Sequence, residues 1–346
     1  MQTKLNIFLG LLLVLFCAWT INISEQQKFP TPTGWPKPSY NFANNPYDSN
    51  AVELGRALFY DPALSVNGEV SCAHCHSPYS SFTHTDHPLS HGIFDRSGKR
   101  NAPVLINMAW QRQFMWDGAI HHLDFQALAP LTDTIEMGSQ LDTVLNYITR
   151  SAPYPELFRR AFGTEEVSTE RFLKAIAQFM LSLISANSKY DKVMRGLQEF
   201  SPQEKAGYQL FQKQCNSCHR EPLFTSGELA KNELPVNPKS PDPGLARISQ
   251  VKSDSFYFKI PTLRNIEYSY PYMHDGRFEA LKTVVRFYAT GRRCLPYGGD
   301  TVIFTQFSPR QEAELMAFLL TLSDSSFIFN TKHQYPHHLQ TTNQKQ

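Results

Sequence analysis

The chain has 346 residues, in which 33 lysines and arginines nearly balance 31 aspartates and glutamates. This length suffices for two domains of ordinary size, and the composition is that of a globular protein rather than a disordered one. The near-neutral charge gives no indication that nucleic acid or an anionic membrane surface is the main partner.

The first residues have the pattern of an export signal. Lys4 is followed by an apolar run over residues 7–19, which is shorter than the roughly 20 residues of a membrane-spanning helix. No small-x-small cleavage site follows, so residues 1–24 are interpreted either as a signal peptide or as an uncleaved N-terminal anchor. Both alternatives predict an exported protein, in the periplasm or exposed at the cell envelope.

Helical spacing of apolar residues predicts a helix over residues 52–60 and another over residues 169–185. The second half repeats this arrangement. A capping box with proline at the first helical position opens a helix at Ser201, and a helix that resembles the one over residues 169–185 follows Ser308. The motif Gly-x-x-Leu-Phe occurs in the first helix of each half, beginning at Gly55 and at Gly207.

This internal similarity indicates that one helical unit is repeated in the chain. We predict an all-α fold with long loops, made of a first domain over residues 25–198 and a second over residues 199–324. The longest loop is expected over residues 226–255, which are rich in proline and serine. A flexible polar tail is expected over residues 325–346, with His333, His337 and His338 in solvent.

Four of the six cysteines fall in two C-x-x-C-H motifs, Cys72-Ala73-His74-Cys75-His76 and Cys215-Asn216-Ser217-Cys218-His219. This spacing lets two thiols form thioethers with one haem while the adjacent histidine binds the iron. A thioredoxin-like redox pair or half of a zinc site is the alternative for a single motif, but two copies in an exported chain favour two haems. The isolated Cys294 is interpreted as a free or buried thiol.

The chain resembles the bacterial di-haem cytochrome c peroxidases and their MauG relatives. The resemblance covers roughly residues 50–322 and is carried by Arg100-Asn101-Ala102-Pro103, Trp116-Asp117-Gly118, Gln126, Pro130, Glu136-Met137-Gly138, Leu263-Arg264-Asn265 and Pro271-Tyr272-Met273-His274-Asp275-Gly276. It implies two cytochrome c-like domains, each with one covalently attached haem, the first of which reacts with peroxide.

The resemblance also implies the roles of residues near the first haem. Glu136 is placed above the iron as the general acid/base that moves a proton between the two peroxide oxygens. Gln126 would hydrogen-bond the distal ligand or water, and Pro130 would limit the space above the haem. Trp116 matches a tryptophan that lies between the haems and assists electron transfer, although it could also be a core residue.

A calcium site between the haems is implied by positions Asn101, Ser269 and Pro271, where backbone carbonyls can serve as ligands beside the asparagine side chain. The second haem's other axial ligand is methionine in ordinary peroxidases and tyrosine in the MauG-like group. Here the matching position is Tyr288, with Met273 as the alternative. His91 lies near the position of a histidine that blocks the first iron in some relatives, but the surrounding loop favours an open iron.

The predicted reaction is reduction of hydrogen peroxide to water, with electrons supplied by a small cytochrome c or copper protein through the second haem. One alternative is MauG-like, peroxide-dependent oxidation of aromatic residues in a partner protein, which Tyr288 favours. Another is an electron carrier without peroxidase activity, which Gln126 and Glu136 disfavour. A homodimer is compatible with the sequence.

Overall fold

The computed structural model describes residues 27–337, so the predicted export segment, residues 1–24, and His338 lie outside the described residues. Within this part of the chain, no helix has the length and apolar character needed to cross a membrane.

The fold is mostly helical, in agreement with the predicted class, and it also contains a small sheet. The helices are α2 (Ser49–Phe59), α3 (Cys72–Cys75), α4 (Leu128–Thr132), α5 (Leu141–Arg150), α6 (Tyr154–Phe162), α7 (Thr169–Ser182), α8 (Lys189–Met194), α9 (Pro202–Gln214), α10 (Ala246–Ser249), α11 (Leu281–Ala289), α12 (Pro309–Leu320) and α13 (Ser325–Ile328). The strands are β1 (Leu229–Lys231), β2 (Phe258–Lys259), β3 (Arg293–Pro296) and β4 (Val302–Ile303).

The sheet has the order β2-β1-β3-β4, with every neighbouring pair antiparallel. The prediction of an all-α fold omitted it. Its strands have two to four residues, too few for an alternating pattern to become visible in the sequence. The predicted long loop over residues 226–255 therefore contains β1 and the short helix α10.

The echoed glycines have the same packing role in both halves. The backbone of α2 approaches α7 so closely at Gly55 that an added Cβ would overlap the carbonyl of Ala175. Gly207 brings α9 equally close to α12, against the carbonyl of Glu314. A side chain at either position would force the paired helices apart, which explains the glycine in both Gly-x-x-Leu-Phe motifs.

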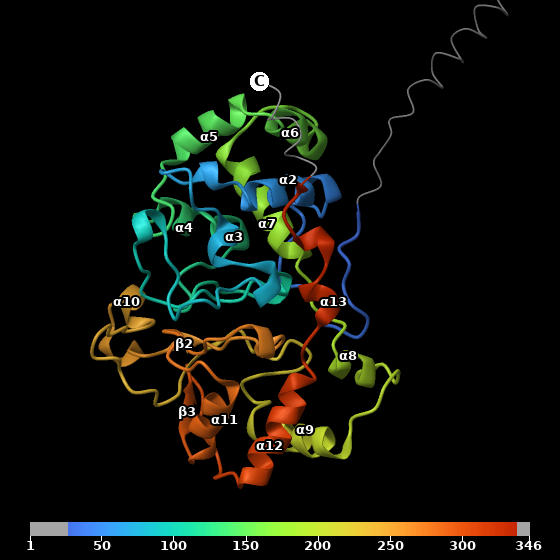
Figure 1. Cartoon of the computed structure of the whole chain (residues 1–346), viewed down its shortest axis with the longest axis vertical. Helices are drawn as coiled ribbons and strands as arrows, with labels where there is room; N and C mark the ends of the chain where they lie inside the picture. Colours follow the sequence, from blue (N-terminus) through green and yellow to red (C-terminus); the bar gives the residue numbers. More distant parts are fainter. Residues whose placement is uncertain (1–26, 338–346) are drawn as a thin grey trace, which may run out of the picture.

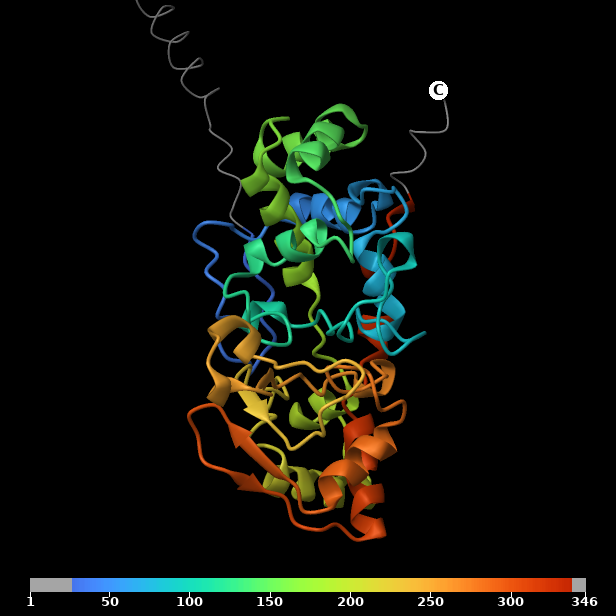
Figure 2. The ribbon, with the colours of Figure 1, turned by 90° about the vertical axis from the view of Figure 1, so that its left-hand side faces the viewer.

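The buried apolar residues form separate clusters in the two halves. One cluster surrounds α2 and α7, in the upper part of Figure 1, and another lies between α9, α11 and α12 in the lower part. Figure 2 shows the helices of the two halves in the same upper and lower parts after a quarter turn. A third, smaller cluster joins Cys218 and Cys294 to the sheet, so Cys294 is a buried free thiol.

The expectation of a flexible polar tail is wrong for residues 325–337. After α12 the chain returns along the first half, where α13 adds Phe327 and Ile328 to that half's apolar cluster. His333 is buried, and its backbone carbonyl accepts a hydrogen bond of 2.6 Å from the Tyr60 hydroxyl. The short apolar run from Phe327 to Phe329, among polar residues, is too weak a sequence pattern to predict this docking.

Candidate functional site

The first C-x-x-C-H motif forms the one-turn helix α3, which ends at His76. Nδ1 of His76 donates a hydrogen bond of 2.7 Å to the carbonyl of Phe82, so Nε2 is left as the free ligand atom. Burial lowers the pKa of His76 to about 4, which keeps the imidazole neutral, as metal binding requires. Cys72 and Cys75 are free thiols.

The second motif has the same local arrangement at the end of α9. Nδ1 of His219 lies 3.2 Å from the carbonyl of Phe224 and 3.1 Å from that of Pro261. Burial lowers its pKa to about 4 as well. Two free thiols on a turn, followed by a neutral histidine with Nε2 available, fit a covalently bound haem at each motif.

A large cavity adjoins the second motif. It is bordered by Cys215, Cys218 and His219, which follow α9, by α11, α12 and the sheet, and by a segment of the first half. The cavity brings together many of the residues predicted at the second haem and between the haems: Cys215, Cys218, His219, Tyr288, Met273, Asn101, Ser269, Pro271 and Trp116.

Both candidate axial ligands of the second haem line this cavity. The hydroxyl of Tyr288, on α11, accepts a hydrogen bond of 2.7 Å from Nδ2 of Asn232. The Oδ1 atom of Asn232 in turn accepts from the backbone N–H of Leu234 at 3.4 Å, which favours this orientation of the amide. Burial raises the pKa of Tyr288. Met273 has a left-handed backbone conformation, with φ at 73°.

Glu136 lies beside the first motif. Burial, and after it the charge of Asp133, raises the pKa of Glu136 to about 6. The charge of Glu136 adds to the effect of burial in raising the pKa of both Cys72 and Cys75, as expected for neighbours. A half-buried carboxyl that titrates near neutral pH is suited to proton transfer.

The backbone around Glu136 is held by the loop that carries His91. The carbonyl of Glu136 accepts a hydrogen bond from the N–H of Ile93 at 2.8 Å. A Cβ at Gly92 would overlap the backbone of residues 135 and 136. Nδ1 of His91 is 2.6 Å from Oδ1 of Asp95, and its carbonyl lies 3.8 Å from the Cys75 sulfur. This loop therefore borders the first motif.

Gln126 lies close to Met115. Its Nε2 atom lies 3.7 Å from the sulfur of Met115, the residue before Trp116. In the part of the chain that the structure describes, no hydrogen bond joins Gln126 to Glu136 or to the first motif. The structure thus places Gln126 near the tryptophan segment.

Trp116 belongs to the first half and lines the cavity of the second motif. Its Nε1 atom donates a hydrogen bond of 2.7 Å to the carbonyl of Asn101, and its own carbonyl accepts at 2.7 Å from the N–H of Lys259 on β2. The indole therefore lies at the junction of the two halves, where it contacts a predicted calcium ligand.

The predicted calcium position also joins the halves. Nδ2 of Asn101 donates to the carbonyl of Pro271 at 2.6 Å, while its Oδ1 atom is buried without a hydrogen-bond partner. A buried oxygen without a partner, beside a backbone carbonyl, fits an oxygen-binding cation such as calcium. Among residues 27–337, no group of three or more histidine, cysteine or acidic side chains could hold a metal ion by itself.

Ion pairs next to Trp116 connect the same segments. The side chain of Asp117 has no exposed surface and lies 2.7 Å from Arg100 and 2.6 Å from Arg247. Arg100 also contacts Asp242 at 2.6 Å. Burial alone would raise the pKa of Asp117, but Arg100 and then Arg247 hold it below its ordinary value.

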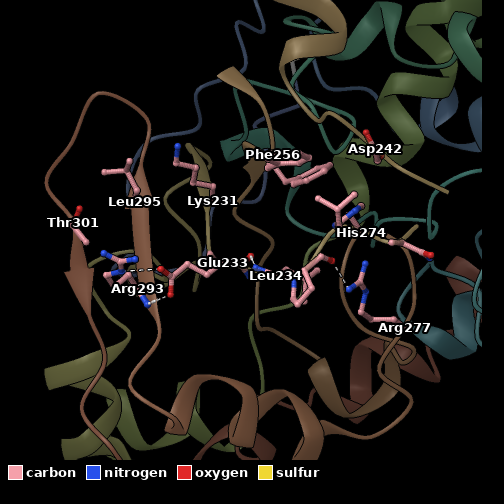
Figure 3. Close-up of a pocket in the computed structure, with 15 residues that line it drawn as sticks. Lys231, Glu233, Leu234, Asp242, Phe256, His274, Arg277, Arg293, Leu295 and Thr301 are labelled. Atoms are coloured by element: carbon pink, nitrogen blue, oxygen red, sulfur yellow. Dashed lines mark hydrogen bonds and ion pairs between the residues drawn. The ribbon is translucent and has the colours of Figure 1, made fainter. Parts of the chain in front are cut away.

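A second cavity lies beside the cavity of the second motif and shares Asn232, Leu234, Phe258 and His274 with it. The rings of Phe258 and His274 stack at 3.8 Å in the shared wall. Several of its charged side chains have partners, such as Arg293 with Glu233 at 2.7 Å (Figure 3).

Three residues of the site could not be identified from the sequence. Asn232 lies 56 positions from the Tyr288 that it contacts. Asp242 and Arg247, which pair with Arg100 and Asp117, lie in the predicted loop. The sequence shows only that Asp242 and Arg247 are charged, and charged residues in a loop are usually solvated.

Comparisons with known proteins agree with this geometry. A family model described as di-haem cytochrome c peroxidase matches residues 49–199. The methylamine utilization protein MauG of Methylophilus methylotrophus is 32% identical over 326 residues, which cover 92% of this chain and 94% of that protein. Cytochrome c551 peroxidase of Nitrosomonas europaea is 33% identical over 286 residues, covering 81% and 82%.

Among solved structures, a MauG-like protein associated with microbial copper homeostasis superposes with a TM-score of 0.81 at 27% identity, covering 90% of this chain and 99% of that one. The two attachment motifs and the mostly helical fold define a c-type cytochrome. The chain belongs to the family of di-haem cytochrome c peroxidases and MauG proteins, so the predicted resemblance is confirmed. Membership implies covalently bound haem c and a peroxide-dependent oxidoreductase activity.

Proposed function

We propose that this protein reduces hydrogen peroxide to water at the first haem, using electrons that a small cytochrome c or copper protein delivers through the second haem. The observation that carries the proposal is Glu136, a half-buried carboxyl with a pKa of about 6 beside Cys72 and Cys75. An electron carrier has no need of an ionisable group in this position.

The first haem, when bound, supplies the iron that takes up peroxide and passes electrons to it. Reduction of one peroxide to two waters consumes two electrons and two protons. Glu136 in its carboxylate form accepts a proton from one peroxide oxygen and returns it to the other, which then leaves as water. Its raised pKa makes the carboxyl an effective donor as well as an acceptor near neutral pH.

Residues 25–198 would form the domain of the first haem and residues 199–324 that of the second. In this arrangement Trp116 provides an aromatic path between the domains, since it belongs to the first and lines the cavity of the second. Calcium at Asn101, Ser269 and Pro271 would hold the ends of this path together. The N-terminal segment would export the chain to the periplasm.

Steady-state oxidation of a reduced small cytochrome c by hydrogen peroxide tests the proposal. We expect turnover by the di-haem protein, and we expect Glu136→Gln to slow it by on the order of 10²-fold, the usual scale for losing a positioned proton-transfer group. Glu165→Gln, which changes an exposed glutamate in the same half, serves as the control. Equal rates in wild type and Glu136→Gln would remove Glu136 from the mechanism.

The calcium proposal has a separate test. Chelation or Asn101→Ala is expected to slow electron transfer from the second haem to the first while both haems remain attached, because calcium held by the Asn101 side chain would fix the backbone carbonyl of Asn101 that accepts from Trp116. Addition of calcium should restore the chelated wild type but not the variant. A chelated protein with unchanged transfer between the haems would exclude this role.

A MauG-like oxidation of aromatic residues in a partner protein is the second candidate, because Tyr288 lines the cavity of the second motif. A phenolate ligand stabilises ferric and higher iron, whereas a thioether favours ferrous iron. Consumption of peroxide without oxidation of the reduced cytochrome would favour this candidate. Haems inert to peroxide would instead indicate an electron carrier.

A further inference from the structure

Lys259 places a positive charge at the wall of the cavity beside the second motif. It is the last residue of β2, and its backbone N–H donates to the carbonyl of Trp116 at 2.7 Å. Its side chain crosses to the first half, where Nζ donates to Oε1 of Gln111 at 2.5 Å. Lys259, Gln111 and Trp116 all line the cavity that also contains Cys215, Cys218 and His219.

The ammonium of Lys259 lacks an anionic partner. Other cations at this junction are paired: Arg100 with Asp117 and Asp242, and Arg247 with Asp117. No carboxylate between residues 27 and 337 lies within ion-pair distance of Lys259, and the one hydrogen bond of its ammonium within these residues is to a neutral amide. Burial lowers the pKa of Lys259 to about 8, with no opposing effect from a neighbouring acid.

A cation removed from water is expected to have a counter-ion. An ammonium has three donors, of which Gln111 uses one, so two remain for an acceptor inside the cavity. Haem carries two propionate carboxylates, which are anionic at neutral pH. The cavity thus combines the attachment residues of a haem with an unpaired cation whose charge is opposite to that of the haem propionates.

We propose that Lys259 forms an ion pair with a propionate of the second haem and, through Gln111, ties that haem to the first half of the molecule. Lys259 is then a positioning residue. Its charge destabilises the ferric state relative to the ferrous state, and so raises the midpoint potential of the second haem. The inference rests on haem attachment at the second motif, and it is independent of whether Tyr288 or Met273 is the axial ligand.

The test is spectroelectrochemical titration of the di-haem protein and its variants. Lys259→Met removes the charge and the hydrogen bond, and Lys259→Gln removes the charge but retains a donor for Gln111. Both are expected to lower the midpoint potential of the second haem and leave that of the first unchanged. Lys259→Arg, which retains the charge, is expected to keep the potential near that of wild type. Lys282→Met is the matched control, since Lys282 is exposed on α11.

An infrared difference spectrum between the reduced and oxidised forms gives a second measurement. Isotopic labelling of the propionates identifies their carboxylate bands, which are expected to shift in Lys259→Met and Lys259→Gln but not in Lys282→Met. Unchanged potential and bands in the Lys259 variants would overturn the inference, as would a change confined to the first haem or an equal fall in Lys259→Arg. Loss of the second haem from wild type itself would instead contradict the cofactor assignment.

Discussion

The pKa of Glu136 predicts how peroxide reduction depends on pH. Burial and Asp133 raise this pKa to about 6, and the carboxylate form is required to accept the proton from peroxide. The rate should therefore be maximal above this pKa and fall as the pH drops through about 6. The pH profile of kcat/KM for peroxide measures the effect.

Asp133→Asn provides a sharper form of this test. The variant keeps an oxygen that can accept from the N–H of Ile135, as Asp133 does at 2.7 Å, but it removes the negative charge beside Glu136. The acidic limb of the profile should move to lower pH, whereas Glu136→Gln should abolish it. A limb that stays in place in both variants would assign the titration to another group.

Tyr288→Phe should change the absorption spectrum and the midpoint potential of the second haem and leave the first haem unaltered. Removal of an anionic donor raises the potential, because the ferric state loses its stabilising ligand. Asn232→Leu should act in the opposite direction, since loss of the hydrogen bond to Tyr288 makes the phenolate a stronger donor. If Tyr288→Phe leaves the second haem unchanged, the ligand role passes to Met273.

The sequence predicted those functional residues whose chemistry depends on local spacing. In each C-x-x-C-H motif the thiols and the histidine are brought together by a single turn, so the motif can be recognised without a fold. Lys259 and Asn232 could not be found in this way. Their roles depend on contacts with Gln111, 148 positions away, and with Tyr288, 56 positions away.

The paired helices carry the architecture of each half. The sequence predicted them because caps and glycine motifs are local signals: the capping box at Ser201 occurs as expected, and the structure has another at Ser308. The four short strands and the docking of α13 were missed, since each depends on partners distant in the chain. Local signals therefore defined the main helices, while tertiary contacts define the sheet and the C-terminal segment.

Because α9 and α12 pack closely at Gly207, any side chain at this position is expected to lower the free energy of unfolding. An added Cβ would overlap the carbonyl of Glu314 and approach Cβ of Phe318. Gly207→Ala should therefore lower the free energy of unfolding by about 1–3 kcal/mol, although alanine favours an isolated helix. Chemical denaturation of the di-haem protein measures this change, with Gln209→Ala on the exposed side of α9 as the control. Equal stability of the two variants would show that the helices can separate at little cost.

Across the whole molecule, the two halves meet through polar contacts around Trp116. Asp117, Arg100, Arg247 and Asp242 form one connected set of ion pairs, and Asn101 contacts Pro271 beside it. The path proposed for electrons thus crosses the place where the halves are held together. Stability of this junction and the rate of electron transfer are expected to change together.

Asp117→Asn tests this coupling. The variant keeps the shape of the side chain but leaves Arg100 and Arg247 without its charge, so we expect unfolding to become easier by roughly 2 kcal/mol or more at neutral pH. Electron transfer between the haems should slow as well. Asp300→Asn, at an exposed site, should change neither quantity. A destabilised variant with normal electron transfer would show that the junction supports the fold alone.

The lowered pKa of Asp117 makes the stability of the fold depend on pH in a defined direction. An acid with a folded-state pKa below its ordinary value of 3.8 stabilises the fold above that value and loses its contribution as the pH falls through the lowered pKa. The difference in unfolding free energy between wild type and Asp117→Asn should therefore be largest near neutral pH and shrink in strong acid. Denaturation curves at several pH values measure it. A difference that is constant with pH would assign the destabilisation to altered packing, because the two proteins differ in charge only at position 117.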